Sequence, residues 1–406
     1  MYFLGIDWAN DKHDLCLLDT EGRILTEMTI QQSLSGFQQL ERLIMRYGVE
    51  NVQLNIERSD GLLVDWIMAQ GWALHVTPTV VVARRRPRRS KSDASDAYLL
   101  AYLLRLRDPD CRLLTRSSPI VLHLRELVRA LDHALEELRR LANRLRYIVL
   151  QYFPNAVKLF TRIDHLIMLA FLEHYPTPEA ARALTPTTLK AFLKAHHYYR
   201  YERIPKLLDI LNLPTPVATV PDGYVAQVRV LVPIVRQFVR TIQQLEKEVI
   251  AVFQTHPEAD WWKAFPGGRG PLTPARMLAW VGDDRNHFPT ADTLQAIAGT
   301  APITRRSGKS KTVEFRRACS HPLRKAADDF ARQSCRYSSW AREYREAHLA
   351  RGHSKARAYR SLANRWMKIV WTLWQRREWY CETLHIANRA RRGQSEGTKL
   401  ILRQAG

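Results

Sequence analysis

The chain has 406 residues, 46% of them hydrophobic and 25% charged, which is typical of a globular protein and excludes a disordered one. Its formal net charge of +22 indicates a polyanionic partner, with nucleic acid as the first candidate and an anionic membrane surface as the second. The longest apolar runs, such as LIMLAFL, fall far short of the roughly 18 residues that a membrane span needs.

The cysteines and the first residues indicate the cellular compartment in which the protein is expected. Five widely spaced cysteines form no CxxC pair and no Cys/His array of the kind that binds zinc. The opening MYFLGIDWAND lacks the basic start and apolar core of a secretory signal. We therefore expect a reduced, cytoplasmic protein without a disulfide framework.

The first hundred residues predict alternating strands and helices. In chain order we expect a strand at 2–9, a hairpin at 13–30, a helix at 36–48, a strand at 52–57, a helix at 61–71, a strand at 73–77, a basic loop at 84–91 and a helix from 93. A hairpin followed by alternating helices and strands indicates a mixed sheet flanked by helices, so residues 1–115 are predicted to form an α/β domain.

The rest of the chain predicts mostly helices. Apolar residues recur every three or four positions over 117–152 and 224–254, which predicts a coiled-coil-type linker at 116–255, an antiparallel stalk with a proline-broken insert. We expect a mostly helical C-terminal domain at 256–385 and a basic tail at 386–406. Between 301 and 377 the chain has 20 Lys and Arg against 5 Asp and Glu, so this region supplies most of the excess charge.

Four acidic residues fall where the predicted elements could gather them. Asp7 ends the first strand, Glu57 ends a later strand, and Asp93 and Asp96 open a helix. Residues three apart share a helical face, so four carboxylates could hold one or two Mg²⁺ ions for phosphodiester cleavage. Alternatively, the two helical acids only favour the helix N-terminus, with Ser92 or Asp93 as its cap.

A serine in a basic segment is the second candidate. Ser307 lies in RRSGKS, beside Arg305, Arg306 and Lys309, which could bind a phosphate and stabilise charge developing on it. A serine hydroxyl needs a base or a charged environment to become a nucleophile. The alternative is a basic loop that binds phosphate, in which Ser307 is one hydrogen-bond donor among several.

Two further features suggest phosphate binding. Six basic residues precede the acidic helix and are candidates for contact with nucleic acid: Arg84, Arg85, Arg86, Arg88, Arg89 and Lys91. The turn PGGRGP before a helix is similar to a helix-hairpin-helix element, which would present backbone N–H groups to phosphate, although such a turn is more often only a turn.

Several segments carry a family resemblance. GIDWANDKHDLCLLD, IERSDG and KSDASDAYLLA are similar to the Asp-Glu-Asp-Asp pattern of the DEDD transposases of one bacterial insertion-sequence family. LRELVR and NRLRYIVLQYFP resemble the linker of that family. FPGGRGPLTPARMLAWVGD, SGK and PLRKA resemble its C-terminal transposase domain. The match runs from about residue 3 to residue 380 and is weakest over 160–250.

The resemblance implies a fold and a chemistry. It implies an RNase H-like N-terminal domain, close to the Holliday-junction resolvase fold, with metal-binding acids at Asp7, Glu57, Asp93 and Asp96. Ser307 is implied as the nucleophile that forms a phosphoserine link to DNA, with Ser310 as a substitute. Where the family has E-x-T-G this chain has ERSDG, and Arg306 replaces the first of two serines.

The resemblance also implies partners. These are Mg²⁺, the DNA of the element ends and target, and a structured noncoding guide RNA, in a homodimer or homotetramer of the bacterial cytoplasm, associated with the nucleoid and without membrane attachment. A transposase of an insertion sequence is therefore the predicted function. The alternatives are a metal-dependent, resolvase-like nuclease without a covalent intermediate, and a nucleic-acid-binding protein without catalysis.

Overall fold

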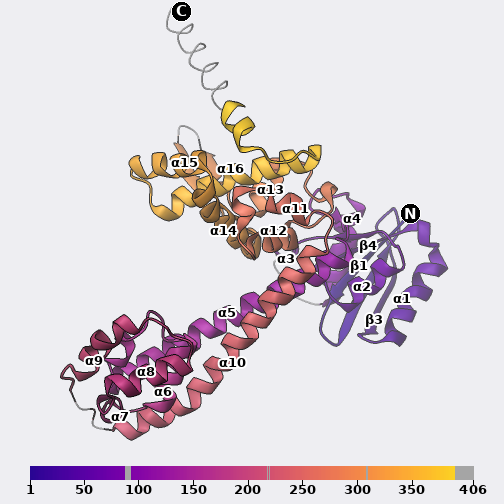
Figure 1. Cartoon of the computed structure of the whole chain (residues 1–406). Helices are drawn as coiled ribbons and strands as arrows, with labels where there is room; N and C mark the ends of the chain where they lie inside the picture. Colours follow the sequence, from indigo (N-terminus) through magenta and orange to yellow (C-terminus); the bar gives the residue numbers. More distant parts are fainter. Residues whose placement is uncertain (87–92, 217, 219, 308–309, 389–406) are drawn as a thin grey trace, which may run out of the picture. The chain divides into compact units, whose positions relative to one another are not determined.

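The computed structural model describes residues 1–86, 93–216, 218, 220–307 and 310–388, without the side chains of 93, 94, 306, 307, 310 and 311. The chain forms two compact units, Met1–Arg116 and Ser117–Gly406, and each is described by itself (Figure 1). The finer domain boundaries expected from the sequence stay predictions. Among the helices of the described ranges, none is both long and apolar enough to cross a membrane.

The first unit is built on a six-stranded mixed sheet in the order β3-β2-β1-β4-β5-β6. Strands β3, β2 and β1 are antiparallel, β1, β4 and β5 are parallel, and β6 is antiparallel to β5. The strands are β1 Tyr2–Trp8, β2 Lys12–Leu18, β3 Ile24–Gln31, β4 Val52–Ile56, β5 Leu74–Val76 and β6 Arg112–Leu113. The predicted hairpin and mixed sheet are confirmed.

Helices cover both faces of this sheet. They are α1 Leu34–Tyr47, α2 Leu62–Ala69, α3 Thr79–Arg85 and α4 Asp93–Arg105, with the 3₁₀ turn η1 Val49–Asn51. Successive side chains of a strand point to opposite faces. Leu4 and Ile6 of β1 belong to a core shared with α1 and α2, whereas Cys16 of β2 packs with Ala97 of α4.

Helix α3 corrects the predicted basic loop. Arg84 and Arg85 form the last turn of this helix, and only the residues after Arg86 leave the described range. The run of three valines disfavours a helix by local propensity. Val82 is fully buried in a cluster with Leu100 of α4, so tertiary packing overrides that propensity.

Gly5 lets α4 lie directly on the backbone of β1. A Cβ atom at Gly5 would come 1.9 Å from the carbonyl oxygen of Ala97 and 2.5 Å from the backbone nitrogen of Ala101. No side chain fits in that space, so only glycine permits this approach of helix and strand.

Two long helices form the stalk of the second unit. Helices α5 Pro119–Tyr152 and α10 Pro221–Gln254 run side by side (Figure 1). Tyr152 stacks on Tyr224 with ring centroids 6.1 Å apart, so the end of one helix meets the start of the other and the pair is antiparallel. Between them the chain forms η2 Ala156–Lys158, α6 Leu166–His174, α7 Pro178–Arg182, α8 Pro186–Ala195, η3 Tyr201–Arg203 and α9 Ile204–Asn212. The two long helices and the broken insert are confirmed.

The remaining described residues are mostly helical, as predicted. Their elements are α11 Ala259–Lys263, η4 Pro266–Arg269, α12 Thr273–Val281, η5 Arg285–His287, α13 Ala291–Ile297, β7 Ile303–Ser307, β8 Ser310–Glu314, α14 His321–Tyr337, α15 Ser339–Ala350 and α16 Lys355–Arg376. In the turn PGGRGP, Pro266, Gly267 and Gly268 are buried at η4, whereas Arg269 is exposed. A Cβ at Gly268 would come 1.9 Å from the Trp262 carbonyl oxygen, so this glycine permits close packing of the turn in the core.

The contact at Gly5 makes a testable prediction. We expect Gly5→Ala to lower the stability of the first unit by about 1–3 kcal/mol or more, because the added methyl group overlaps backbone atoms that cannot swing away. Differential scanning calorimetry would measure the shift. Gly223→Ala, at a helical site with no atom within 4 Å of the new Cβ, is the matched control and should stabilise slightly. Equal effects of the two substitutions would contradict the packing argument.

Candidate metal and phosphate site

Asp7 and Glu57 lie at the carboxyl ends of two neighbouring parallel strands. Ile6 of β1 pairs with Ile56 of β4, so the next residue on each strand is one of these acids. Ile6 and Ile56 face the core shared with α1 and α2. Because side chains alternate along a strand, Asp7 and Glu57 both point to the α4 side of the sheet.

Helix α4 supplies the other two predicted acids. Asp93 is its first residue, but the Asp93 side chain lies outside the described residues. Asp96, one turn later, is only 3% exposed. It directly precedes Ala97, which packs on Gly5, two residues before Asp7. The same close contact therefore positions both the helical and the strand acids.

One arginine joins the described carboxylates. Arg86 donates from Nε to Asp96 Oδ1 at 2.6 Å, and its Nη2 donates to Asp96 Oδ2. The hydrogen bond to Asp96 raises the pKa of Arg86, and the negative charges of Asp96, Asp7 and Glu57 raise it further. Arg86 thus contacts Asp96 and lies within range of the charges of Asp7 and Glu57.

Burial and like charge act together on Glu57. Burial raises the pKa of Glu57 above its ordinary value, and the charge of Asp96 raises it further, while Arg86 and Arg58 oppose the rise. A carboxylate held near a second carboxylate favours a nearby cation. Arg86 and Arg58 are the cations that act on Glu57.

Among the described residues, no three Asp, Glu, His or Cys side chains are placed to hold one metal ion together. The Asp93 side chain is not part of that description. The four-carboxylate metal site therefore stays a prediction. The structure places Asp7 and Glu57 at the ends of adjacent strands and pairs Asp96 with Arg86.

Asn55 is a supporting residue that sequence reasoning missed. It is fully buried on β4, two residues before Glu57. Its Nδ2 donates to Thr77 Oγ1 at 2.9 Å and to the Leu100 carbonyl oxygen at 2.8 Å. These bonds tie β4 to the residue after β5 and to α4 beneath the acids. The available signal was the pair of amides, Gln53 and Asn55, in the otherwise apolar run VQLNI, because a buried amide needs partners.

The extra acid of the ERSDG segment has its own partner. Asp60 accepts from Arg58 Nη2 at 3.1 Å. The Arg58 guanidinium also lies over the Trp8 ring, 4.0 Å from its centroid. Asp60 is exposed, so its charge is balanced at the surface beside the acidic cluster.

The six upstream basic residues do not form one uniform surface. Arg85 pairs with Asp108 at 3.0 Å, and Arg86 pairs with Asp96, so both are neutralising partners of acids in the first unit. The sequence analysis did not predict these ion pairs. Arg84 is exposed. Arg88, Arg89 and Lys91 lie outside the described residues, and nucleic-acid binding by all six stays a prediction.

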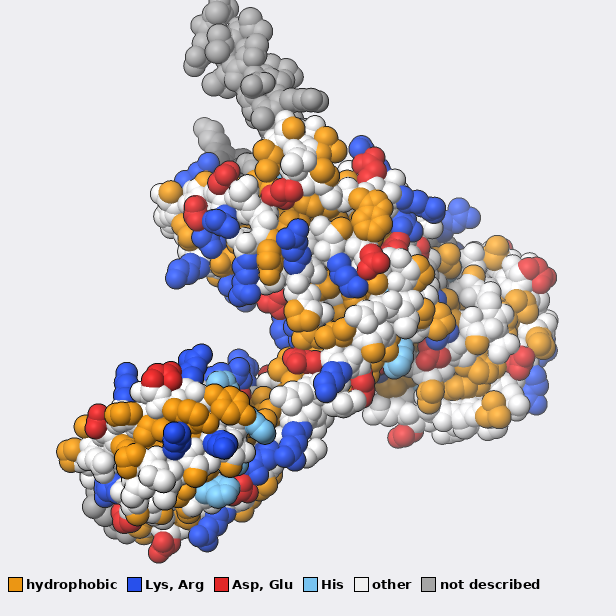
Figure 2. All heavy atoms as spheres, in the orientation of Figure 1, with side chains coloured by type: hydrophobic (Ala, Val, Ile, Leu, Met, Phe, Trp, Pro, Cys, Tyr) orange, Lys and Arg blue, Asp and Glu red, His pale blue; other side chains and the backbone are white. Residues whose placement is uncertain are grey.

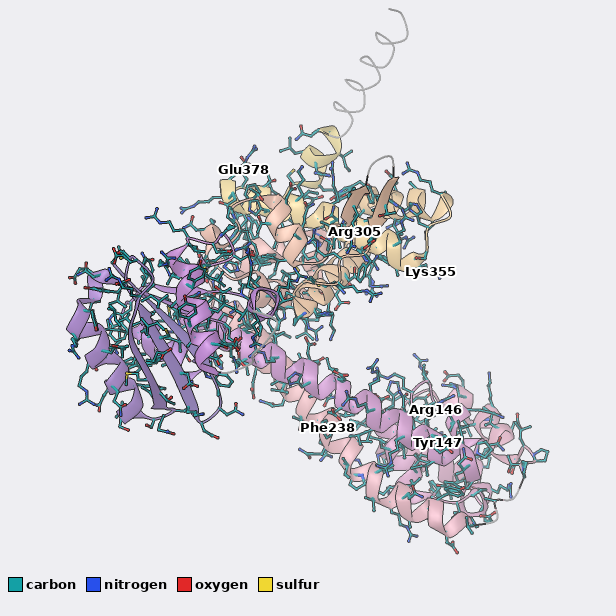
Figure 3. All side chains as sticks on the ribbon, turned by 180° about the vertical axis from the view of Figure 1, so that it is seen from behind. Arg146, Tyr147, Phe238, Arg305, Lys355 and Glu378 are labelled. Carbon is teal, nitrogen blue, oxygen red and sulfur yellow. The ribbon has the colours of Figure 1, made fainter. Side chains whose placement is uncertain are left out.

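The predicted nucleophile lies on a β-hairpin of the second unit, where the sequence alone allowed a loop. Ser307 ends β7, and its backbone pairs with that of Ser310 at the start of β8. Arg305 lies on the same strand and forms an ion pair with Glu314 at 3.3 Å (Figure 3). The side chains of Arg306 and Ser307, and all of Gly308 and Lys309, lie outside the described residues.

Contacts with α14 and α16 hold both ends of this hairpin. Before β7, Thr300 Oγ1 donates to Asn364 Oδ1 at 3.0 Å. After β8, the Phe315 ring lies between Arg360, 4.1 Å from its centroid, and Arg324, at 4.5 Å. The hairpin therefore projects from a firmly packed base.

Comparisons with known proteins agree over most of the chain. One family model, described as Transposase, matches residues 4–154, and another, described as Transposase IS116/IS110/IS902 family, matches residues 266–346. The first range includes the four predicted metal-binding acids, and the second includes Ser307.

Three relatives cover most of the chain's length. The mini-circle putative transposase for IS117 of Streptomyces coelicolor is 31% identical over 386 residues, 90% of this chain and 92% of the relative. The insertion element IS110 uncharacterized 43.6 kDa protein of the same organism is 26% identical over 91% of this chain and 93% of its own. The insertion element IS900 uncharacterized 42 kDa protein of Mycobacterium paratuberculosis is 28% identical over 77% and 79%.

The Arg86–Asp96 pair gives the prediction for this site. We expect Arg86→Gln to lower the free energy of unfolding by about 2–4 kcal/mol, because it leaves a buried carboxylate without its cation. Urea denaturation would measure the loss. Arg85→Gln removes the neighbouring charge from a pair whose arginine side chain is 54% exposed, and should cost less than about 1 kcal/mol.

A double variant distinguishes the loss of the Arg86–Asp96 ion pair from nonspecific destabilisation of the fold. Adding Asp96→Asn to Arg86→Gln removes the stranded charge, so it should recover part of the lost stability. Additive losses in the double variant, or equal losses in Arg86→Gln and Arg85→Gln, would contradict the assigned role of the pair.

Proposed function

Because the chain belongs to the IS110 family of DEDD transposases, we propose that this DNA transposase cleaves and joins strands through a phosphoserine at Ser307 with the help of Mg²⁺. The observation that carries the proposal is that Asp7 and Glu57 end neighbouring parallel strands on the side of the sheet covered by α4, which carries Asp96 paired with Arg86. Separate strands and a helix bring these acids together at a cost in repulsion and burial, which is typical of a functional site.

The proposed fold of the first unit is RNase H-like. Strands β3, β2 and β1 form an antiparallel meander, and β4 and β5 continue the sheet in parallel on the other side of β1. This strand order supports the assignment. In such an arrangement the acids belong at the carboxyl ends of β1 and β4, which is where Asp7 and Glu57 lie.

The donor set fits a divalent metal ion, which transposases of this family typically use. Asp7, Glu57, Asp93 and Asp96 offer carboxylate oxygens alone, which is the ligand type that Mg²⁺ prefers. A bound divalent ion supplies positive charge to the oxygens of the reacting phosphate. Both oxygens of Asp96 accept hydrogen bonds from Arg86, so a metal ion held by Asp96 would use the remaining lone pairs of this carboxylate and would be repelled by the charge of Arg86.

Ser307 is the proposed nucleophile. Its Oγ attacks the scissile phosphorus, a new P–O bond forms, and the P–O bond to the leaving strand end breaks. The leaving oxygen takes up a proton, and Ser307 gives one up. The phosphoserine keeps the energy of the broken bond, so the strand can be joined to a new end without another energy source. Arg305, Arg306 and Lys309 are proposed to position the phosphate.

The proposed partners are DNA, a guide RNA and further copies of the chain. The excess charge of residues 301–377 suits a polyanion, held largely through phosphate contacts. Exposed apolar residues on the stalk support assembly: Tyr147 is 65% exposed on α5, and Val230 is 61% exposed on α10. Figure 3 shows Tyr147 on the part of α5 beside the insert. An assembly of two or four copies would allow several DNA strands to be cleaved at the same time.

A covalent adduct is the test of the nucleophile. The protein is incubated with Mg²⁺, DNA carrying the element ends and the adjacent noncoding RNA, and a denaturing gel then separates protein linked to DNA. We expect Ser307→Ala to lower adduct formation by at least about 10³-fold, because it removes the attacking oxygen. Ser310→Ala, the residue paired with Ser307 across the turn, is the matched control and should keep the adduct.

Other outcomes identify other functions. Loss of the adduct only in Ser310→Ala would show that Ser310, and not Ser307, is the nucleophile. Free cleaved ends without adduct in the wild type and in Ser307→Ala would indicate a nuclease. Intact binding without cleavage by the wild type would indicate a binding protein.

A further inference from the structure

A polar pocket lies beside the segment that precedes strand β7 of the hairpin, within the second unit. It has a volume of about 290 Å³ between α13, α15 and α16. Its lining side chains all carry polar atoms: Gln295, Tyr344, Ser361, Asn364, Arg365 and Lys368. Pockets for small molecules begin near this size and are usually lined mainly by apolar side chains. The polar lining indicates a charged or strongly hydrogen-bonding ligand.

The charge of the pocket is positive. Ser361, Asn364, Arg365 and Lys368 follow the spacing of one helical face on α16. Among the described residues, neither Arg365 nor Lys368 forms an ion pair with an acid, whereas Arg345 nearby on α15 pairs with Glu346. Two cations without acidic partners beside one pocket favour an anionic ligand.

Hydrogen bonds orient two neutral side chains of the pocket, Gln295 and Asn364. Gln295 Nε2 donates to the Asn364 carbonyl oxygen at 2.7 Å, and Asn364 Oδ1 accepts from Thr300. Because the Asn364 side-chain oxygen is engaged by Thr300, its Nδ2 is left as a donor for a ligand. Figure 2 shows Lys and Arg side chains scattered over the visible face of the region of α14 to α16.

The pocket is coupled to the segment that carries Ser307. Thr300, which hydrogen-bonds Asn364, is seven residues before Ser307. Seven residues of extended chain span at most roughly 23 Å. A DNA strand spaces its phosphates by about 3.4 Å along the helix axis, so about seven phosphates fit in that length.

We propose that this pocket binds one backbone phosphate of the DNA strand, within about seven nucleotides of the phosphate that Ser307 attacks. Arg365 and Lys368 hold the phosphate by charge, and Asn364 donates to its oxygens. The distance from the scissile phosphate rests on the proposed function, whereas the phosphate site itself does not. The pocket thus fixes the register of the strand relative to the hairpin.

The first experiment measures binding of fluorescein-labelled duplex DNA by anisotropy over a range of salt. We expect Arg365→Gln/Lys368→Gln to weaken binding by about tenfold and to reduce the salt slope by roughly one to two. Lys190→Gln/Lys194→Gln is the matched control, since it removes the same charge from two exposed positions on α8, outside the basic region 301–377. The control should change affinity less than about threefold. Equal losses in both double variants would overturn the proposal.

The second experiment locates the phosphate. Phosphates of one strand are replaced singly by neutral methylphosphonates, and binding is measured for the wild type and the pocket variant. We expect one position that weakens wild-type binding and has no effect on the pocket variant. If no position behaves so, the proposal fails, even when Ser307 forms its adduct. If one does, the pocket stands, even when no adduct forms.

An RNA probe of the same sequence distinguishes the other source of phosphate. Weaker RNA binding with unchanged DNA binding in the pocket variant would overturn the assignment to DNA. In each experiment, both double variants must have the melting temperature of the wild type. A lower melting temperature would indicate a folding defect.

Discussion

The close contact between α4 and Gly5 is the constraint on which the acidic site depends. A helix whose backbone lies directly on a strand cannot slide or rotate without steric overlap. Asp96 precedes Ala97, the residue packed on Gly5, and Asp7 follows Gly5 by two positions. The buried amide of Asn55 adds a second tie between β4 and α4. Both contacts are structural, yet their result is a fixed geometry for charged groups.

Charge balance is the second theme of the acidic site. Arg86 balances the buried carboxylate of Asp96, and the charges of Asp7 and Glu57 raise the pKa of the same arginine further. Arg86 directly follows α3 and directly precedes the segment with Arg88, Arg89 and Lys91. The cation of the acidic site is thus continuous in sequence with residues predicted to contact nucleic acid. Nucleic acid bound there would compete with Asp96 for Arg86, and would leave Asp96 to a metal ion.

Much of the fold follows from patterns in the sequence, and parts of the site do not. The short apolar runs were enough to predict that Asp7 and Glu57 each end a strand, whereas the pairing of these two strands as neighbours is seen only in the structure. The pairing of Arg86 with Asp96 was not predictable, because six similar basic residues precede Asp96 and only packing selects one. Helix α3 was missed because its stability comes from the burial of Val82 and not from local propensity. The pocket beside Asn364 was missed because its residues come from three separate helices.

Binding of Mn²⁺ to the protein without nucleic acid tests the acidic site most directly, since Mn²⁺ takes the same oxygen ligands and its free form is counted by electron paramagnetic resonance. Removing one ligand in Asp7→Asn or Asp96→Asn should weaken binding by at least about tenfold. Arg86→Gln should strengthen binding, because the ion then replaces the lost positive charge. Unchanged Mn²⁺ affinity in both Asn variants would show that these acids do not hold a metal ion, and would contradict the proposed chemistry.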